Sequence, residues 1–192
     1  MELQKIGVKV FTVACDDIPL ADFIDVFHSW IQATDGVYYD VADYSHMQAG
    51  PGIVLVAHHA NISIDETNSR RGLLYSQKAH LKGSNQEKIG TVFRAALQQC
   101  RRLEQEPALR GRLKFSAEEF VVLINDRLLA PNTKETFAAL EPDFDDALGS
   151  LFGNATVKLQ QNCNPRQRFS VSVRRSIVRS DKLIEQIYAC DP

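Results

Sequence analysis

The spacing of apolar side chains changes along the chain, and each spacing predicts a different kind of element. Residues 5–15, 119–129, 155–161 and 168–175 are rich in β-branched residues or alternate between apolar and polar, a pattern typical of strands. Residues 19–35, 85–104 and 133–152 place apolar residues three and four positions apart, which predicts amphipathic helices. Pro142 interrupts the third helix, so we expect a kink or two short helices there. A last helix is expected after Ser180.

The stretch 36–65 reads as two β-rich runs joined by a turn at residues 48–53. Matching the more apolar sets of the two runs pairs Met47 with Val54. The same register sets Asp43 opposite His58 on an otherwise apolar face, where cross-strand neighbours are about 5 Å apart. We therefore predict that the Asp43 carboxylate and the His58 imidazole form a hydrogen-bonded pair. Residues 72–81 read as a further strand.

The order of these elements occurs twice. A strand, a turn containing Asp and Pro, a helix, a hairpin and a closing helix are expected in residues 1–106 and again in 117–192, with 107–116 as the connector. The first half has one extra strand, and residue identity between the halves is negligible. We predict an α+β fold with an antiparallel or mixed sheet, helices mainly on one face, and an internal duplication of a β-α-β-β-α unit. The halves form either one continuous domain or two pseudo-symmetric lobes.

Composition narrows the class of protein. The chain of 192 residues is 44% hydrophobic and 24% charged, values that are ordinary for a soluble globular protein. Its net charge of −2 argues against a dedicated nucleic-acid binder. No apolar run approaches the roughly 20 residues of a membrane-spanning helix, and the N-terminus lacks the basic region followed by an apolar core that is typical of a signal peptide. We expect a cytoplasmic protein with neither nucleic acid nor membrane as a partner.

No motif with a known mechanism is present. The sequence has no nucleotide-binding glycine loop, zinc-ligand spacing or nucleophile elbow. Its four cysteines are scattered without a Cys-x-x-Cys pair. We therefore predict no cofactor.

Three classes of function remain open, and all depend on the 36–65 hairpin. In the first, its outward face binds a small molecule or forms a homodimer through polar and aromatic side chains, namely Tyr38, Tyr44, His46, His59 and Asn61. In the second, His58 is a general base oriented by Asp43, unless that pair only fixes the register. In the third, a divalent metal binds to Asp40, His46 and His59, with or without His80.

A separate concentration of charge lies near the second hairpin, at Arg166, Arg168, Arg174, Arg175 and Arg179. Because adjacent strand residues point to opposite faces, Arg174 and Arg175 do not form a single anion clamp. An acidic partner or a phosphate group at these arginines is a further hypothesis.

Overall fold

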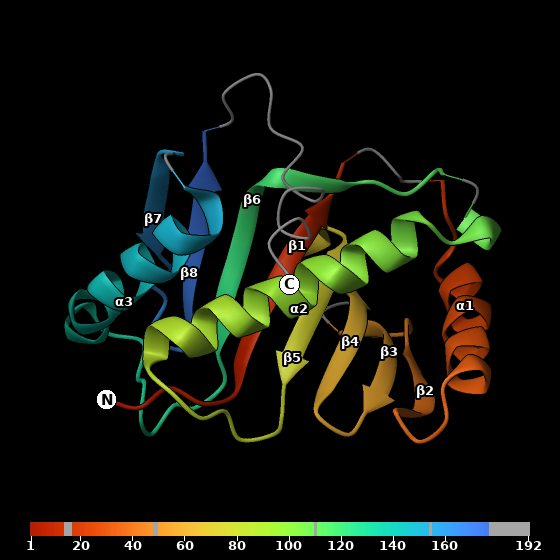
Figure 1. Ribbon diagram of the computed structural model, residues 1–192, viewed down its shortest axis with the longest axis horizontal. Coiled ribbons are helices and arrows are strands. Elements are labelled where there is room, and N and C mark those ends of the chain that lie inside the picture. Colours follow the sequence, from red (N-terminus) through yellow and green to blue (C-terminus); the bar gives the residue numbers. More distant parts are fainter. Residues whose placement is uncertain (14–16, 48–49, 110, 154, 177–192) are drawn as a thin grey trace.

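The structure is a computed structural model that describes residues 1–13, 17–47, 50–109, 111–153 and 155–176. Its described part contains three α-helices and one antiparallel sheet of eight strands, so the predicted α+β class is confirmed (Figure 1). The strands are β1 Ile6–Thr12, β2 Tyr38–Tyr44, β3 Gly52–Ala57, β4 Ala60–Asp65, β5 Gly72–Gln77, β6 Phe115–Ile124, β7 Val157–Gln161 and β8 Phe169–Arg175. The helices are α1 Leu20–Ala33, α2 Asn85–Glu104 and α3 Lys134–Phe152.

The strands are ordered β2-β3-β4-β5-β1-β6-β8-β7 across the sheet. From β1 the chain passes through α1 to the outer edge at β2, and it then returns strand by strand to β5 beside β1. From β6 it passes through α3 to the other edge at β7 and returns through β8 to β6. The neighbouring strands β1 and β6 therefore join the two parts of the chain into one sheet.

Residues paired directly across antiparallel strands point to the same side of the sheet. One row of paired residues is buried and apolar, and it consists of Ile53, Ile64, Leu73, Val10, Phe120 and Val173. These side chains belong to the same core cluster as the buried residues of α1, α2 and α3. In Figure 1, α2 crosses in front of β1 and β5, and it contacts both strands. We call this side of the sheet the helix face.

The neighbouring row points away from the helices and mixes polar with apolar side chains. It consists of Val54, Ser63, Leu74, Lys9, Val121 and Ser172. The next row on the same side consists of Val56, Asn61, Ser76, Gly7, Leu123 and Ser170. We call this side the far face, because it is turned away from the viewer in Figure 1.

Two of the three described helices, α2 and α3, begin at a residue whose side chain accepts a hydrogen bond from a backbone N–H of the first turn. At α2 the Ser84 side chain accepts a hydrogen bond from the Glu87 N–H, and the Glu87 carboxylate accepts one from the Ser84 N–H, which completes a capping box. Phe93 of α2 then packs edge-on against Phe120 of β6, with ring centroids 5.6 Å apart. Such burial of aromatic rings contributes more to stability than the caps do.

The third helix differs from its expectation. Residues 134–152 form one helix that contains Pro142, so the alternative of two short helices is wrong. Proline removes one hydrogen bond from the helix interior, and the exposed position of Pro142 leaves the buried stripe of Leu140, Phe144 and Leu148 intact.

The predicted register of the 36–65 hairpin is also wrong. The second run is not one strand: β3 ends at Ala57, and the chain turns at His58 and His59 into β4. Asp43 pairs with Ile53 instead of His58. A strand spanning residues 53–65 would exceed the roughly 10 residues that strands usually reach, whereas the turn lets the two halves of the run pair with each other as β3 and β4.

The helix expected after Ser180 and the arginine at position 179 lie outside the described residues. Within the described residues, no helix is both long enough and apolar enough to cross a membrane.

Candidate functional site

Four hollows lie on the far face, and Arg168 lines all of them. The loop hollow, of about 640 Å³, lies between β6 and the β7–β8 connection. The strand hollow, of about 390 Å³, lies over the start of β1 and the end of β5. The hairpin hollow, of about 440 Å³, lies over β2 to β5, and the paired-charge hollow, of about 210 Å³, lies beside Lys9. No residue of α1, α2 or α3 lines any of the four.

The loop hollow and the strand hollow together form what we call the basic end. Five cationic side chains line them, namely Lys5, Lys78, Arg127, Arg166 and Arg168, and no Asp or Glu does. None of the five is in an ion pair with a described residue. Uncharged donors and acceptors fill the remaining polar positions, including Asn61, Ser76, Asn125, Gln160 and Ser170.

The topology brings these cations together from distant parts of the sequence. Lys5 precedes β1, Lys78 follows β5, Arg127 follows β6 and Arg168 precedes β8. These four strands are neighbours and antiparallel, so the start of one strand lies beside the end of the next. The basic end is this line of strand ends, on the far face of the sheet.

The backbone at Lys5 adopts a conformation that residues other than glycine rarely adopt. Its φ is +52°, in the left-handed region, and its carbonyl accepts a hydrogen bond from Asn125 N–H at 3.1 Å. Such strain persists only where surrounding contacts hold it, and it occurs often at functional sites.

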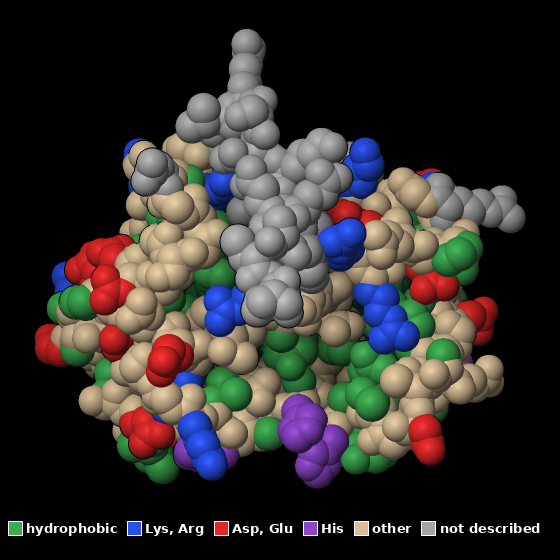
Figure 2. Space-filling view, viewed as in Figure 1, with side chains coloured by type: hydrophobic (Ala, Val, Ile, Leu, Met, Phe, Trp, Pro, Cys, Tyr) green, Lys and Arg blue, Asp and Glu red, His purple; other side chains and the backbone are tan. Residues whose placement is uncertain are grey.

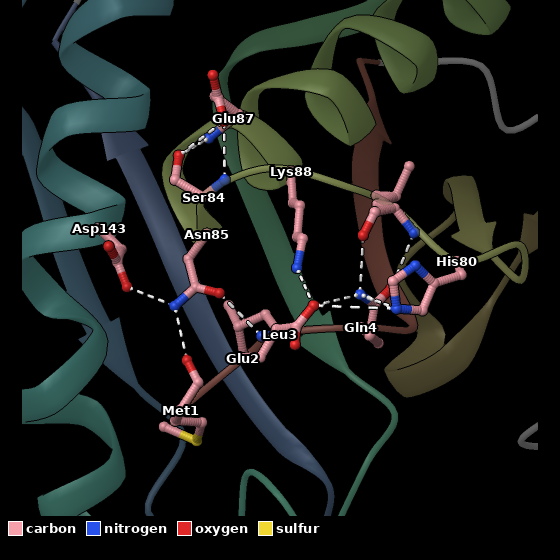
Figure 3. Close-up of polar contacts among 11 residues, drawn as sticks. Met1, Glu2, Leu3, Gln4, His80, Ser84, Asn85, Glu87, Lys88 and Asp143 are labelled. Atoms are coloured by element: carbon pink, nitrogen blue, oxygen red, sulfur yellow. Dashed lines mark hydrogen bonds and ion pairs between the residues drawn. The ribbon is translucent and has the colours of Figure 1, made fainter.

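The segment before Lys5 supplies those contacts (Figure 3). The Gln4 amide donates to the carbonyl of Leu81 at 2.9 Å and accepts from its N–H at 3.0 Å, so it ties β1 to the chain that follows Lys78. The buried ammonium of Lys88 donates to the Glu2 carboxylate at 2.8 Å. Asn85 accepts from Leu3 N–H and donates to the Met1 carbonyl. Lys5 is thus held at a fixed place relative to α2.

The opposite end of the far face has charges that are already paired. The Lys9 ammonium donates to the Asp65 carboxylate at 2.5 Å and to the Arg70 carbonyl at 2.7 Å. The side chains of Lys9 and Asp65 are both buried. Burial lowers the pKa of Lys9, and the hydrogen bond to Asp65 opposes that shift. This pair fixes the connection between β4 and β5, because Asp65 also accepts from the Thr67 hydroxyl.

Arg70 and Glu119 form the second pair at that end. The guanidinium donates two hydrogen bonds, at 3.0 and 2.9 Å, to the two carboxylate oxygens, and it lies 3.7 Å from the centre of the Phe11 ring. The hydrogen bonds from Arg70 lower the pKa of Glu119. Arg174 also approaches Glu119, at 3.7 Å, whereas Arg175 is buried over the Phe152 ring on the helix face. The expectation that Arg174 and Arg175 point to opposite faces is confirmed.

The predicted pair of Asp43 and His58 is not formed. Asp43 is exposed on the edge strand, and its carboxylate accepts a hydrogen bond from Ser45 N–H at 2.8 Å. Hydrogen bonds from Ser45 lower the pKa of Asp43. His58 lies at the β3–β4 turn, exposed, with its ring against those of Tyr39 and His59. Since Asp43 pairs beside the other end of β3, neither residue orients the other.

The five residues predicted to bind a ligand do not share one surface. Tyr44 and Asn61 line the hairpin hollow on the far face. Tyr38 lies on the helix face, where its hydroxyl accepts a hydrogen bond from Arg102 at 2.9 Å. A register shift between Tyr38 and Asp40 reverses the alternation that the sequence suggested. His46 and His59 are exposed in turns at opposite ends of β3.

The metal hypothesis finds no support in the described residues. No three of their His, Cys, Asp and Glu side chains lie close enough together to hold an ion. His80 lies beside Gln4 and Glu2 (Figure 3).

The sequence pattern pointed to Arg166 and Arg168 but not to Lys5, Lys78 and Arg127. No local pattern marks these three residues. Their common feature is a position just outside a strand end, and this signal becomes informative only when the strand order is known.

Comparison with known proteins gave no match: the chain matches no family model, no curated protein and no solved structure. The function is therefore inferred from the geometry alone.

Proposed function

We propose that the protein binds a small anionic molecule, carrying a phosphate or carboxylate group, at the basic end of the far face. The observation that supports this most directly is the set of five cations around two adjoining hollows that no carboxylate lines. The chain as a whole has 24 acidic and 22 Lys and Arg residues, so a random sample of its surface would mix both signs. The helix side does mix them, with acidic and basic side chains interspersed in Figure 2.

Arg168 is the residue we expect to contact the anion most closely. It is half-buried, it lines all four hollows, and no described residue pairs with it. Arginine presents a planar fork of N–H donors that matches carboxylate and phosphate oxygens. A partly buried guanidinium without a partner is costly to keep in a fold, and an incoming anion would remove that cost.

A small ligand fits the site better than a nucleic acid does. Nucleic-acid binders usually display a basic surface over a whole domain, whereas this chain has a net charge of −2. The cations lie around bounded hollows of about 640 and 390 Å³, a size range typical of small-molecule sites. The 36–65 hairpin contributes to the basic end through Asn61, which lines the strand hollow, whereas Tyr44 lines only the neighbouring hairpin hollow.

The proposal is tested by titrating inorganic phosphate and pyrophosphate into the full chain and measuring heat release. Arg168→Gln removes the guanidinium, and we expect at least about a tenfold loss of affinity, since hydrogen bonds to a charged group contribute about 1.5–3 kcal/mol. Arg94→Gln is the matched control, because Arg94 is an exposed arginine on α2 that lines none of the hollows.

Equal weakening by Arg168→Gln and Arg94→Gln would show a diffuse charge effect and would contradict the proposal. Binding of single-stranded DNA in preference to both phosphate probes would redirect it to nucleic acid.

Two further expectations are retained as proposals. The internal duplication is supported by the outward passage through one helix and the stepwise return that both parts of the chain share. The expected homodimer would use the outward face of the 36–65 hairpin; Tyr38 is buried, so of the two tyrosines of that face only the exposed Tyr44 supports it. Sedimentation velocity measures the dimer directly.

A further inference from the structure

The strand hollow and the hairpin hollow adjoin each other on the far face. Asn61, Ser76 and Arg168 line both. A molecule whose anionic group lies in the basic end can therefore extend its remaining atoms along the sheet toward β3. The two hollows have volumes of about 390 and 440 Å³, so such a molecule is larger than an inorganic anion.

Gly7 lies in the floor of the strand hollow, on the central strand β1. Glycine weakens a strand interior, and it is often found where a ligand approaches the backbone closely. The fold itself does not need glycine here. Its φ is not positive, and an added Cβ would meet its nearest neighbour, the Tyr75 carbonyl oxygen, at 3.4 Å, an ordinary contact. Because Gly7 has no side chain, the strand hollow reaches down to the backbone of β1 at this position.

The hairpin hollow differs in character from the basic end. Apolar side chains form much of its wall, among them Tyr44, Val54, Val56 and Leu74. The acidic residue that lines it, Asp65, is already paired with Lys9. Apart from Arg168 at the junction, the hairpin hollow therefore offers no unpaired charge to a ligand.

We infer that the ligand is an organic phosphate or carboxylate with an uncharged, largely apolar body about the size of an aromatic ring. Its anionic group lies in the basic end, and its body passes over Gly7 into the hairpin hollow. This inference rests on the proposed function, because it takes the anion to be held by Arg168. It adds the chemical class of the ligand and names Gly7 and Val56 as residues that select it.

The test compares matched probes that differ only in the body. Dissociation constants for inorganic phosphate and phenyl phosphate, and for acetate and benzoate, are measured by calorimetry on the full chain. The expected result is that at least one aromatic probe binds about tenfold more tightly than its partner, because a ring is removed from water. The pair that shows the larger gain identifies the anionic group as phosphate or carboxylate.

The gain in affinity from the ring is then measured in two variants. Gly7→Val adds a side chain to the floor of the strand hollow, and Val56→Gln makes the hairpin hollow polar. In both variants we expect the ratio of the dissociation constants for the probes without and with the ring to fall toward one. Gly149→Ala is the control, since Gly149 lies in α3 with no atom near its added Cβ, and the ratio should keep its wild-type value there. Thermal unfolding verifies folding, and Val56→Gln decides the question if Gly7→Val does not fold.

Two outcomes would overturn the inference alone, and a third would overturn it together with the proposed function. If phosphate or acetate binds in an Arg168-dependent way but the ring adds nothing, the inference is wrong and the proposed function stands. If the gain survives both Gly7→Val and Val56→Gln, the body lies elsewhere and the inference is wrong. If none of the four probes binds in a way that Arg168→Gln weakens, both are wrong.

Discussion

Lys9 and Arg168 are two cations on the same face of one sheet, and they differ in whether the protein supplies their partners. The Lys9 ammonium has a carboxylate and a backbone carbonyl within 2.7 Å, and its pKa is lowered by burial. Arg168 has no partner among the described residues. The first arrangement is that of a structural pair, and the second leaves a cation available for a ligand.

Replacing Lys9 alone should destabilise the protein strongly. Lys9→Met leaves the Asp65 carboxylate buried without its cation, and breaking a buried pair in this way costs about 3–5 kcal/mol. The double variant Lys9→Met with Asp65→Leu removes both charges, so it should recover much of that loss. Urea unfolding of the two variants and the wild type measures the difference. A double variant no more stable than Lys9→Met would show that the pair does not act as a unit.

At the scale of elements, periodicity predicted the helices better than the strands. The stripe of Ile89, Phe93 and Leu97 predicted α2, because apolar residues that keep helical spacing along so long a segment rarely form any other element. The β3–β4 turn was not predicted, since His58 and His59 are not residues that usually mark a tight turn. Missing that turn shifted the register of the hairpin, and the predicted site of Asp43 and His58 was lost with it.

Pro142 gives an element-scale prediction. Pro142→Ala restores an N–H group that can donate to the carbonyl of Ala138, and it removes the clash of the proline ring with the preceding turn. Because position 142 is exposed, no core packing changes, and we expect a gain of about 1–3 kcal/mol in the free energy of unfolding. Chemical denaturation measures it. Glu141→Ala, one position earlier on the exposed surface, is the control, and an equal gain there would rule out the proposed cause.

At the scale of the whole molecule, the candidate site depends on strand order, which the sequence did not reveal. The α+β class followed from the alternation of strand and helix patterns. The neighbours of each strand did not, because residues far apart in sequence pair according to the packing of the whole core. Arg166 and Arg168 belong to an arginine-rich segment that is visible in the sequence. Lys5 and Lys78 are candidates only because the fold brings β1, β5 and β8 close together.

The pairing of β1 with β6 is the seam between the two parts of the chain, and the basic end straddles it. Lys5 and Lys78 come from one side of this seam, and Arg127, Arg166 and Arg168 come from the other. The positive charges on the two sides of this seam repel one another. An anion that contacts cations on both sides removes this repulsion and links the two parts of the chain, so the anion-bound protein would resist separation of the two parts more than the anion-free protein.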